Sequence, residues 1–344
     1  MKKLLLIIAF IITFLGISTF VSIYYLTQTG NNIDEVEVYI PENSTISKSI
    51  NKLNELDFLK PKLFFKIFIK AYSKYSNSYI YAGLYKIKPN QTNLEVIKML
   101  FNGGYDLTVK VTIPEGSLYS EFEKAIFKEV EVDTMAFRSL IKSDSIKAIL
   151  GVPSGRNIEG YLLPETYFLY KYSSPQFLVN KLVTEQTKYW KSLNFDGTTE
   201  KTIELNGMNF DKNELITLAS IVQAETALIS EAPIVAGLYL NRLKIGMLLQ
   251  SDPTVQFASG NKSRVLYKDL EVNSRYNTYK YTGLPPGPIN SPGKKVIEAV
   301  INYEKHNYYY MVAYGDGSGK HRFATNLNEH NRNVSLYRKA RRAN

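Results

Sequence analysis

One acidic residue lies where its segment predicts an apolar side chain. From position 211 to 225, apolar residues recur at spacings of three and four, the pattern of one helix face. They are Leu215, Leu218, Ala219 and Val222, and Glu225 is the next position on that face. Burial disfavours the charged form of a carboxylic acid, so we expect Glu225 to keep its proton near neutral pH. A protonated carboxyl can donate to a glycosidic oxygen, which makes Glu225 a candidate general acid.

A structural explanation of Glu225 stays open at this point. An acidic residue at a helix end often pairs with a nearby cation, and Arg242 is a plausible partner. The pattern of one helix face does not choose between an ion pair and catalysis.

Two further carboxylates are candidates for substrate contacts. Glu165 follows Pro164 between aromatic residues that could flank a sugar, although it could equally cap a following helix. Asp252 precedes Pro253, where an aspartate commonly caps a helix. Its functional alternative is to hold substrate hydroxyls in a cleft.

The composition excludes several other chemistries. The chain has no cysteine, which rules out disulfides, thiolate metal sites and cysteine nucleophiles. His306, His321 and His330 lack zinc-ligand spacing, and there is no G-x-S-x-G or phosphate-loop motif. We therefore expect no metal and no cofactor. The formal charge of +10 suits an anionic polymer or a membrane surface, and without nucleic-acid-binding motifs we expect no nucleic acid partner.

The N-terminus predicts a membrane anchor. Lys2 and Lys3 precede an uncharged run from Leu4 to Leu26, which is long enough to cross a bilayer as a helix. Positive charge before the run predicts a cytoplasmic N-terminus and an extracytoplasmic remainder. A cleaved signal peptide is the alternative, but the run is long and lacks a small-residue cleavage site. No second run of this length follows, so a single crossing of the cell (inner) membrane is expected.

A strand, turn and helix pattern follows a short polar linker at 27–34. It occurs three times, at 36–56, 84–101 and 109–130, each with an alternating strand, a Pro turn and a helix. The first turn falls at 41–44, and Gly103-Gly104 ends the second copy. This predicts a small α/β module over about 36–110. Such a module could bind a ligand or act only as a spacer.

The remainder predicts a mixed α+β domain of longer helices separated by Pro/Gly-rich turns. Asp211 and Glu214 form a capping-box pattern at the start of the helix that bears Glu225. A second helix is expected from about Ser230 to Gly246, with Pro233 in its first turn. The run 308–313 predicts a buried strand.

Taken in order, these segments resemble the MltG/YceG-like family of endolytic murein transglycosylases. The motifs that carry the resemblance are Ile158–Thr166, Ala219–Thr226, Asn241–Leu243, Leu249–Val255, Tyr276–Tyr279, Gly283–Ile289, and His321, Phe323, Thr325 and Asn326. The anchor and the Pro-Glu-Gly turn at 114–116 also match, so the resemblance covers nearly the whole chain.

The resemblance implies a fold, an activity and a site. It implies an α+β chain with an anchor at 1–27, a linker and LysM-like module at 28–110, and a catalytic domain at 111–344. It implies Glu225 as the catalytic acid/base, the second carboxylate of a Glu-x-Glu-Thr motif whose first position is Gln223 here. Expected substrate contacts are Glu165, Gln250, Asp252, Tyr276, Asn277 and Asn326.

The implied reaction is non-hydrolytic cleavage of the MurNAc–GlcNAc β-1,4 bond of nascent peptidoglycan, which leaves 1,6-anhydro-MurNAc ends and terminates strand elongation. The expected partners are glycan strands, the membrane and peptidoglycan synthases. Two alternatives stay open. One is a hydrolytic muramidase, with Glu165 or Asp252 activating water, and the other is a non-catalytic peptidoglycan-binding membrane protein.

Overall fold

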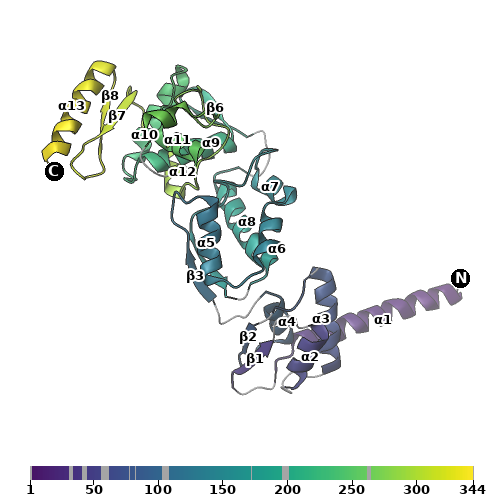
Figure 1. Cartoon of the computed structure of the whole chain (residues 1–344). Coiled ribbons are helices and arrows are strands. Elements are labelled where there is room, and N and C mark those ends of the chain that lie inside the picture. The colour runs from purple at the N-terminus through teal and green to yellow at the C-terminus, as the bar shows by residue number, and fades with distance from the viewer. Residues whose placement is uncertain are drawn as a thin grey trace. The chain divides into compact units, whose positions relative to one another are not determined.

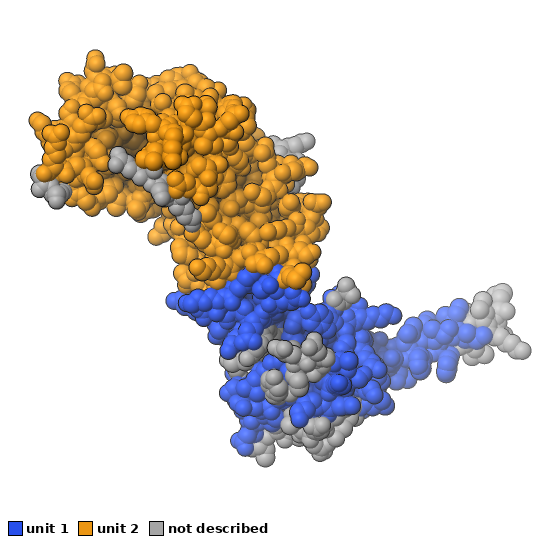
Figure 2. Space-filling view, in the orientation of Figure 1, with its two compact units in different colours: residues 1–110, 127–134, 168–178 blue, residues 111–126, 135–167, 179–344 orange. Residues whose placement is uncertain are grey.

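The computed structural model describes residues 2–343 except 31–33, 41–44, 56–61, 77, 82, 103–107, 172, 196–200 and 262–264. The chain forms two compact units (Figure 2). Unit 1 comprises Met1–Lys110, Phe127–Thr134 and Phe168–Leu178, and unit 2 comprises Val111–Ile126, Met135–Tyr167 and Val179–Asn344.

Unit 1 begins with the long apolar helix α1 (Lys2–Thr27), drawn in purple in Figure 1. Its stretch Ile7–Thr27 has a mean hydropathy of 2.2 and is exposed over most of its length, with half-buried residues only near its end. The hydroxyls of Thr13, Thr19 and Ser22 donate to carbonyls four residues earlier, so these polar groups are satisfied within the helix. The predicted apolar helix is confirmed, and by length and composition it could span a membrane.

After α1, unit 1 contains a module made of a two-stranded antiparallel sheet and three helices. In β1 (Val36–Ile40) and β2 (Gly83–Ile87), Val36 lies opposite Ile87 and Ile40 opposite Gly83. Helices α2 (Ile46–Glu55) and α3 (Lys62–Ser76) lie between the strands in sequence, and α4 (Asn93–Asn102) follows β2. The repeated pattern predicted α2 and α4 but missed α3. The predicted turn at 41–44 and Gly103-Gly104 lie outside the described residues.

The end of α1 packs against this module. Asn93 donates through its side chain to the carbonyl of Tyr25 and through its backbone N–H to that of Gln28. Thr29 forms an isolated antiparallel β-bridge with Thr92, and Leu26 packs on the module's apolar core. Residues 28–30, predicted as part of a polar linker, are therefore attached to the module. Because residues 28–30 lie outside a helix, their backbone groups need other hydrogen-bond partners. Residues just before α4 and at its start provide them.

The next stretch of the chain contributes elements to both units. They are β3 (Thr108–Thr112), α5 (Tyr119–Glu129), α6 (Thr134–Ile141), α7 (Asp144–Leu150), β4 (Thr166–Tyr170) and α8 (Pro175–Ser192), with β3 pairing β4. The third predicted strand and helix correspond to β3 and α5. A strand follows Glu165, so the suggestion that Glu165 caps a following helix was wrong.

The C-terminal part of unit 2 centres on the helix α9 (Lys212–Glu225), which packs against α10 (Ala232–Lys244) and α12 (Lys294–Ile301). The other elements are β5 (Ile203–Leu205), β6 (Met208–Phe210), α11 (Asp252–Ser259), the 3₁₀ helix η1 (Tyr267–Glu271), β7 (Tyr310–Ala313), β8 (His321–Ala324) and α13 (Leu327–Ala343). The mixed α+β class is confirmed. β7 is half-buried rather than buried as predicted.

Helix α9 is the core helix of this unit. The predicted capping box is present, because Asp211 accepts from the Glu214 N–H and Glu214 accepts from the Asp211 N–H. All residues from Leu215 to Val222 are buried, which is a wider apolar surface than the single predicted face. A helix enclosed on every side has a fixed position. Its last residue, Glu225, is therefore held by a rigid element.

Candidate active site

Glu225 ends α9 at the point where the chain leaves the core. The residue is half-buried, while Thr226 turns into extended backbone and returns a hydrogen bond from its N–H to the Val222 carbonyl. The side chain thus keeps some access to solvent although its carboxyl is densely surrounded by protein.

Two hydroxyl groups hold one oxygen of this carboxyl. Tyr239 of α10 donates to Oε1 over 2.8 Å, and Ser251, just before α11, donates to the same oxygen over 2.5 Å. Tyr239 and Ser251 are almost completely buried, so these donors cannot turn to water instead. Within the described part of the chain, no group donates to Oε2. The carboxyl is therefore oriented through one oxygen, and the other is left for a ligand.

The surroundings raise the pKa of the Glu225 carboxyl above its usual range. Burial is the main cause, because it penalises the charged form. The hydrogen bonds from Ser251 and Tyr239 oppose this shift, the negative charge of Asp252 adds to it, and His321 opposes it weakly. Since burial dominates, the environment favours the protonated acid that donation to a glycosidic oxygen requires.

Arg242 does not neutralise Glu225. Its guanidinium donates instead to the backbone carbonyls of Tyr309, over 2.6 Å, and Leu249, over 2.5 Å. No ion pair joins it to Glu225 among the residues that the structure describes. The structural alternative considered from the sequence therefore does not account for this acid.

Asp252 lies beside this acid at the start of α11. Its carboxylate is exposed and accepts a 2.6 Å hydrogen bond from the hydroxyl of Tyr279. It contributes charge rather than a hydrogen bond to Glu225. The pair provides one acid in a densely packed setting and one carboxylate open to water.

The other predicted substrate contacts lie in different settings. Gln250 is exposed, adopts a positive φ of 50° and precedes Ser251. Tyr276 is half-buried with its ring 4.8 Å from that of Phe257. Asn326 is exposed and caps α13 by accepting from the N–H of Glu329.

Asn277 and Glu165 are occupied by other groups. Asn277 is fully buried, and its amide donates to the carbonyls of Leu270 and Val272 and accepts from the Tyr279 N–H. It therefore shapes the turn that carries Tyr279. Glu165 forms a 2.7 Å ion pair with Lys294, and within the described ranges no hydrogen bond or ion pair joins it to Glu225.

Sequence reasoning missed the two hydroxyls that hold Glu225. Ser251 lies between the predicted contacts Gln250 and Asp252, and its position in that motif was the available signal. Tyr239 gave no signal, because one tyrosine on an apolar helix has the pattern of a core residue. Gln223, the departure from the family motif, accepts a 3.0 Å hydrogen bond from the N–H of Gly293 and so holds a neighbouring turn.

A hollow of about 580 Å³ lies next to this site, and neither Glu225 nor Asp252 is among the residues that line it. Ala224 lines it next to Glu225, and Pro253 lines it next to Asp252. Tyr119 and Phe257 contribute aromatic surface, which suits the flat faces of sugar rings.

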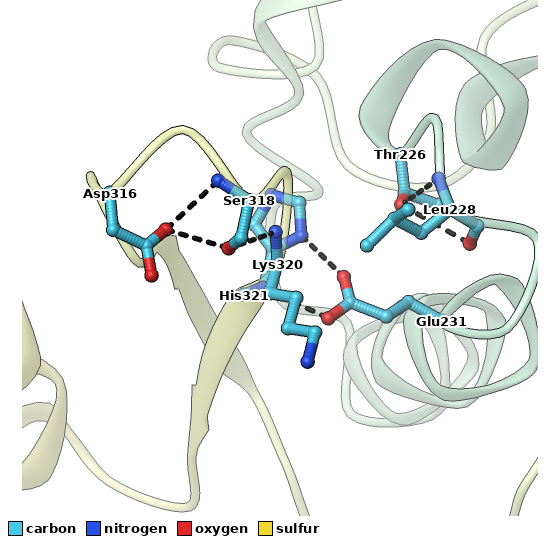
Figure 3. A network of polar contacts seen from close by, with 7 residues as sticks. All are labelled: Thr226, Leu228, Glu231, Asp316, Ser318, Lys320 and His321. Atoms are coloured by element: carbon cyan, nitrogen blue, oxygen red, sulfur yellow. Dashed lines mark hydrogen bonds and ion pairs between the residues drawn. The ribbon is translucent and has the colours of Figure 1, made fainter.

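A second polar network ties the C-terminal hairpin to the segment after Glu225 (Figure 3). Glu231, at the start of α10, accepts from the backbone N–H of His321 over 3.0 Å and from its ring Nδ1 over 2.7 Å. Thr226 accepts from the Leu228 N–H in the turn between. Glu231 and His321 are both largely buried, so the hairpin is fastened close to the end of α9.

Comparison with known proteins shows the family to which this chain belongs. The model of the YceG-like family matches residues 38–336. The chain therefore belongs to the YceG-like family, as its motifs predicted.

Curated relatives carry the name endolytic murein transglycosylase. One from Bacillus subtilis is 31% identical over 316 residues, covering 88% of this chain and 84% of the relative. One from Streptococcus pneumoniae R6 is 30% identical. That match covers 89% of this chain and 59% of the relative's length. A crystal structure of a YceG-like protein from Listeria monocytogenes is 30% identical, with a TM-score of 0.50 over 87% of this chain and 99% of that one. The enzyme class that these names give, lytic murein transglycosylase, is the predicted one.

Proposed function

We propose that this chain cleaves the MurNAc–GlcNAc β-1,4 bond within peptidoglycan strands, with Glu225 as its acid and base. Family membership and the names of the relatives support this reaction. The observation that carries it is the raised pKa of a carboxyl that two buried hydroxyls hold through one oxygen.

In the first step, Glu225 donates its proton to the bridging oxygen. The bond from C1 of MurNAc to that oxygen breaks, GlcNAc leaves with a free hydroxyl, and positive charge develops at C1. Oε2 is the atom suited to donation, because Tyr239 and Ser251 occupy Oε1. Those two donors also stabilise the carboxylate that remains.

In the second step, the same carboxylate accepts the proton of the C6 hydroxyl of MurNAc. O6 bonds to C1 and closes a 1,6-anhydro ring, which restores protonated Glu225 without consuming water. The nucleophile is already tethered to the reacting sugar, so proximity replaces a second catalytic carboxylate.

Hydrolysis is the second candidate reaction, and the position of the Asp252 carboxylate favours it. This exposed carboxylate lies close enough to influence the charge of Glu225 and could activate a water molecule. Its hydrogen bond with Tyr279 equally suits a role in holding substrate hydroxyls.

Mass spectrometry of digested glycan distinguishes the two reactions. Lytic cleavage gives anhydro ends one water lighter than the reducing ends that hydrolysis gives. Reducing ends alone would overturn the proposed chemistry, and unshortened glycan with both native and Glu225→Gln protein would favour a non-catalytic binding protein.

We also propose a location for the chain and a role for each of its parts. We place α1 across the cell membrane with the N-terminus in the cytoplasm, residues 28–110 as a linker and LysM-like module, and residues 111–344 as the catalytic domain outside. The order strand, helix, helix, strand in unit 1 supports the LysM-like assignment. An anchored enzyme that cuts within new strands would end their elongation beside peptidoglycan synthases. Protease protection of the N-terminus in sealed vesicles tests the topology.

A further inference from the structure

Helix α3 presents a mixed apolar and basic face that no described part of the chain covers. Its opposite face is buried through Phe65 and Ile69, which belong to the core of unit 1. On the outer face, Leu63 is 65% exposed and Ile67 is 49% exposed. Burial of side chains of this size against another apolar surface is favourable.

The exposed residues form a single stripe. Leu63, Ile67, Lys70 and Lys74 follow one another at spacings of four, three and four, and the exposed Lys66 lies beside them. The helix contains no Asp or Glu. One end of the face is therefore apolar and the rest is positively charged, a pattern typical of helices that lie in the interface of an anionic membrane.

The contacts of α3 place its apolar end beside the anchor. Phe64, in the first turn of α3, stacks on Tyr25 in the last turn of α1, with ring centroids 4.3 Å apart. Tyr24 packs edge-on against Tyr25. Tyrosines at the end of an apolar span mark the level of the lipid headgroups.

The module cannot swing away from this position on a flexible tether. Asn93 binds the carbonyls of Tyr25 and Gln28, and Leu26 packs into the core that also contains Ile69. The orientation of α3 relative to α1 is therefore set by unit 1 itself.

We propose that α3 is a second membrane contact, in which Leu63 and Ile67 enter the headgroup region of the outer leaflet and Lys66, Lys70 and Lys74 bind anionic lipid headgroups. This inference rests on the proposed insertion of α1. Docking at a second point fixes the tilt of unit 1 on the bilayer, which a single helix does not do. The length and apolarity of α1 carry the anchoring, and α3 supplies orientation and lipid preference.

The absence of cysteine from the chain allows a direct test. Full-length protein carrying Ile67→Cys is labelled with an environment-sensitive fluorophore and reconstituted into phosphatidylcholine vesicles with or without phosphatidylglycerol. Met135→Cys, at an 80% exposed site in unit 2, is the matched control. In anionic vesicles, we expect the label at 67 to shift to the blue and to be quenched by headgroup-proximal spin-labelled lipid, while the label at 135 stays in water.

Charge variants test the role of the lysines. Lys66→Gln/Lys70→Gln/Lys74→Gln should reduce the docked fraction, by about fivefold in the docking equilibrium for each lysine. Lys124→Gln/Lys128→Gln/Lys339→Gln removes the same net charge at exposed positions elsewhere and should leave docking unchanged.

Three outcomes would overturn the inference. A label at 67 that remains in water while the protein resists carbonate extraction contradicts docking by α3 and leaves the anchor intact. Protein removed by carbonate overturns the anchor and the inference together. A blue shift that depends on the protein-to-lipid ratio rather than on anionic lipid means that a second copy of the chain covers the face. Cleavage of solubilised glycan, measured separately, reports on the catalytic proposal alone.

Discussion

The hydroxyl of Ser251 donates to Oε1 of Glu225 over 2.5 Å, joining the start of α11 to the end of α9. Tyr239 donates to the same oxygen from α10. Three helical segments thus meet at one atom of one acid. Such a carboxyl has a defined direction before any substrate arrives, which limits the reorganisation that proton transfer requires.

Replacing Glu225 by Gln should abolish most glycan cleavage while the fold remains. General acid catalysis contributes about 10²- to 10⁴-fold, and an amide cannot donate a proton in this way. Anhydro-end formation, measured by chromatography and mass spectrometry, should fall by at least that factor. Glu214→Gln is the matched control on the same helix, because Gln also serves in a capping box. Equal losses in both variants would contradict the assignment.

Removing either hydroxyl should move the pH dependence of cleavage. The bonds from Ser251 and Tyr239 stabilise ionised Glu225 and lower its pKa, against the upward effect of burial. Ser251→Ala and Tyr239→Phe should therefore raise that pKa, so the acid form persists to higher pH. The basic limb of kcat/KM against pH should shift upward in both variants. An unchanged or downward limb would show that another group controls it.

Glu225 should lower the free energy of unfolding at neutral pH. The pKa of Glu225 in the fold lies above its ordinary value of 4.5, so its contribution to stability is fully present below about pH 4.5 and is lost as pH rises through the raised pKa. Glu225→Gln removes this loss. The melting temperature of the variant minus that of the native protein should therefore be larger at neutral pH than at acidic pH, as measured by calorimetry. A difference that does not depend on pH would contradict a raised pKa.

Gly160 should tolerate alanine less well than Gly155. Both adopt positive φ, of 77° and 75°, which costs a side-chain-bearing residue about 1–2 kcal/mol. At Gly160, a Cβ would also collide with the ring of Pro288 and the carbonyl of Asn290, whereas at Gly155 it would meet open space. Gly160→Ala should lose about 1–3 kcal/mol more in the free energy of unfolding, followed by denaturant titration. Equal losses would mean that the 286–290 turn moves aside freely.

Breaking the Glu231–His321 pair should loosen the hairpin. Glu231→Ala leaves the backbone N–H of His321 and its ring without their acceptor, at a cost of about 1–3 kcal/mol per buried group. Hydrogen exchange should rise in β7 and β8 and not in β5 and β6. Asp316→Ala, which removes two exposed hydrogen bonds from Ser318, should have a much smaller effect.

The sequence by itself determined the local elements and the candidate acid. Helical periodicity, the capping box at Asp211 and the N-terminal apolar run predicted α9, its starting point and α1, because these signals depend on neighbours a few residues apart. The ordered motifs predicted the YceG-like family. The unusual placement of Glu225 on an apolar face identified it before any contact was known.

Only the tertiary structure decided what surrounds that acid. Ser251 is 26 residues away along the chain from Glu225, and no periodicity relates them. The structure likewise showed Arg242 bound to backbone carbonyls instead of Glu225, and Asn277 buried in a turn. Long-range contacts arise from the packing of whole helices, in which many weak apolar contacts set the positions of a few polar atoms. A local pattern can therefore propose an acid, but the pKa of that acid depends on burial and partners that folding brings together.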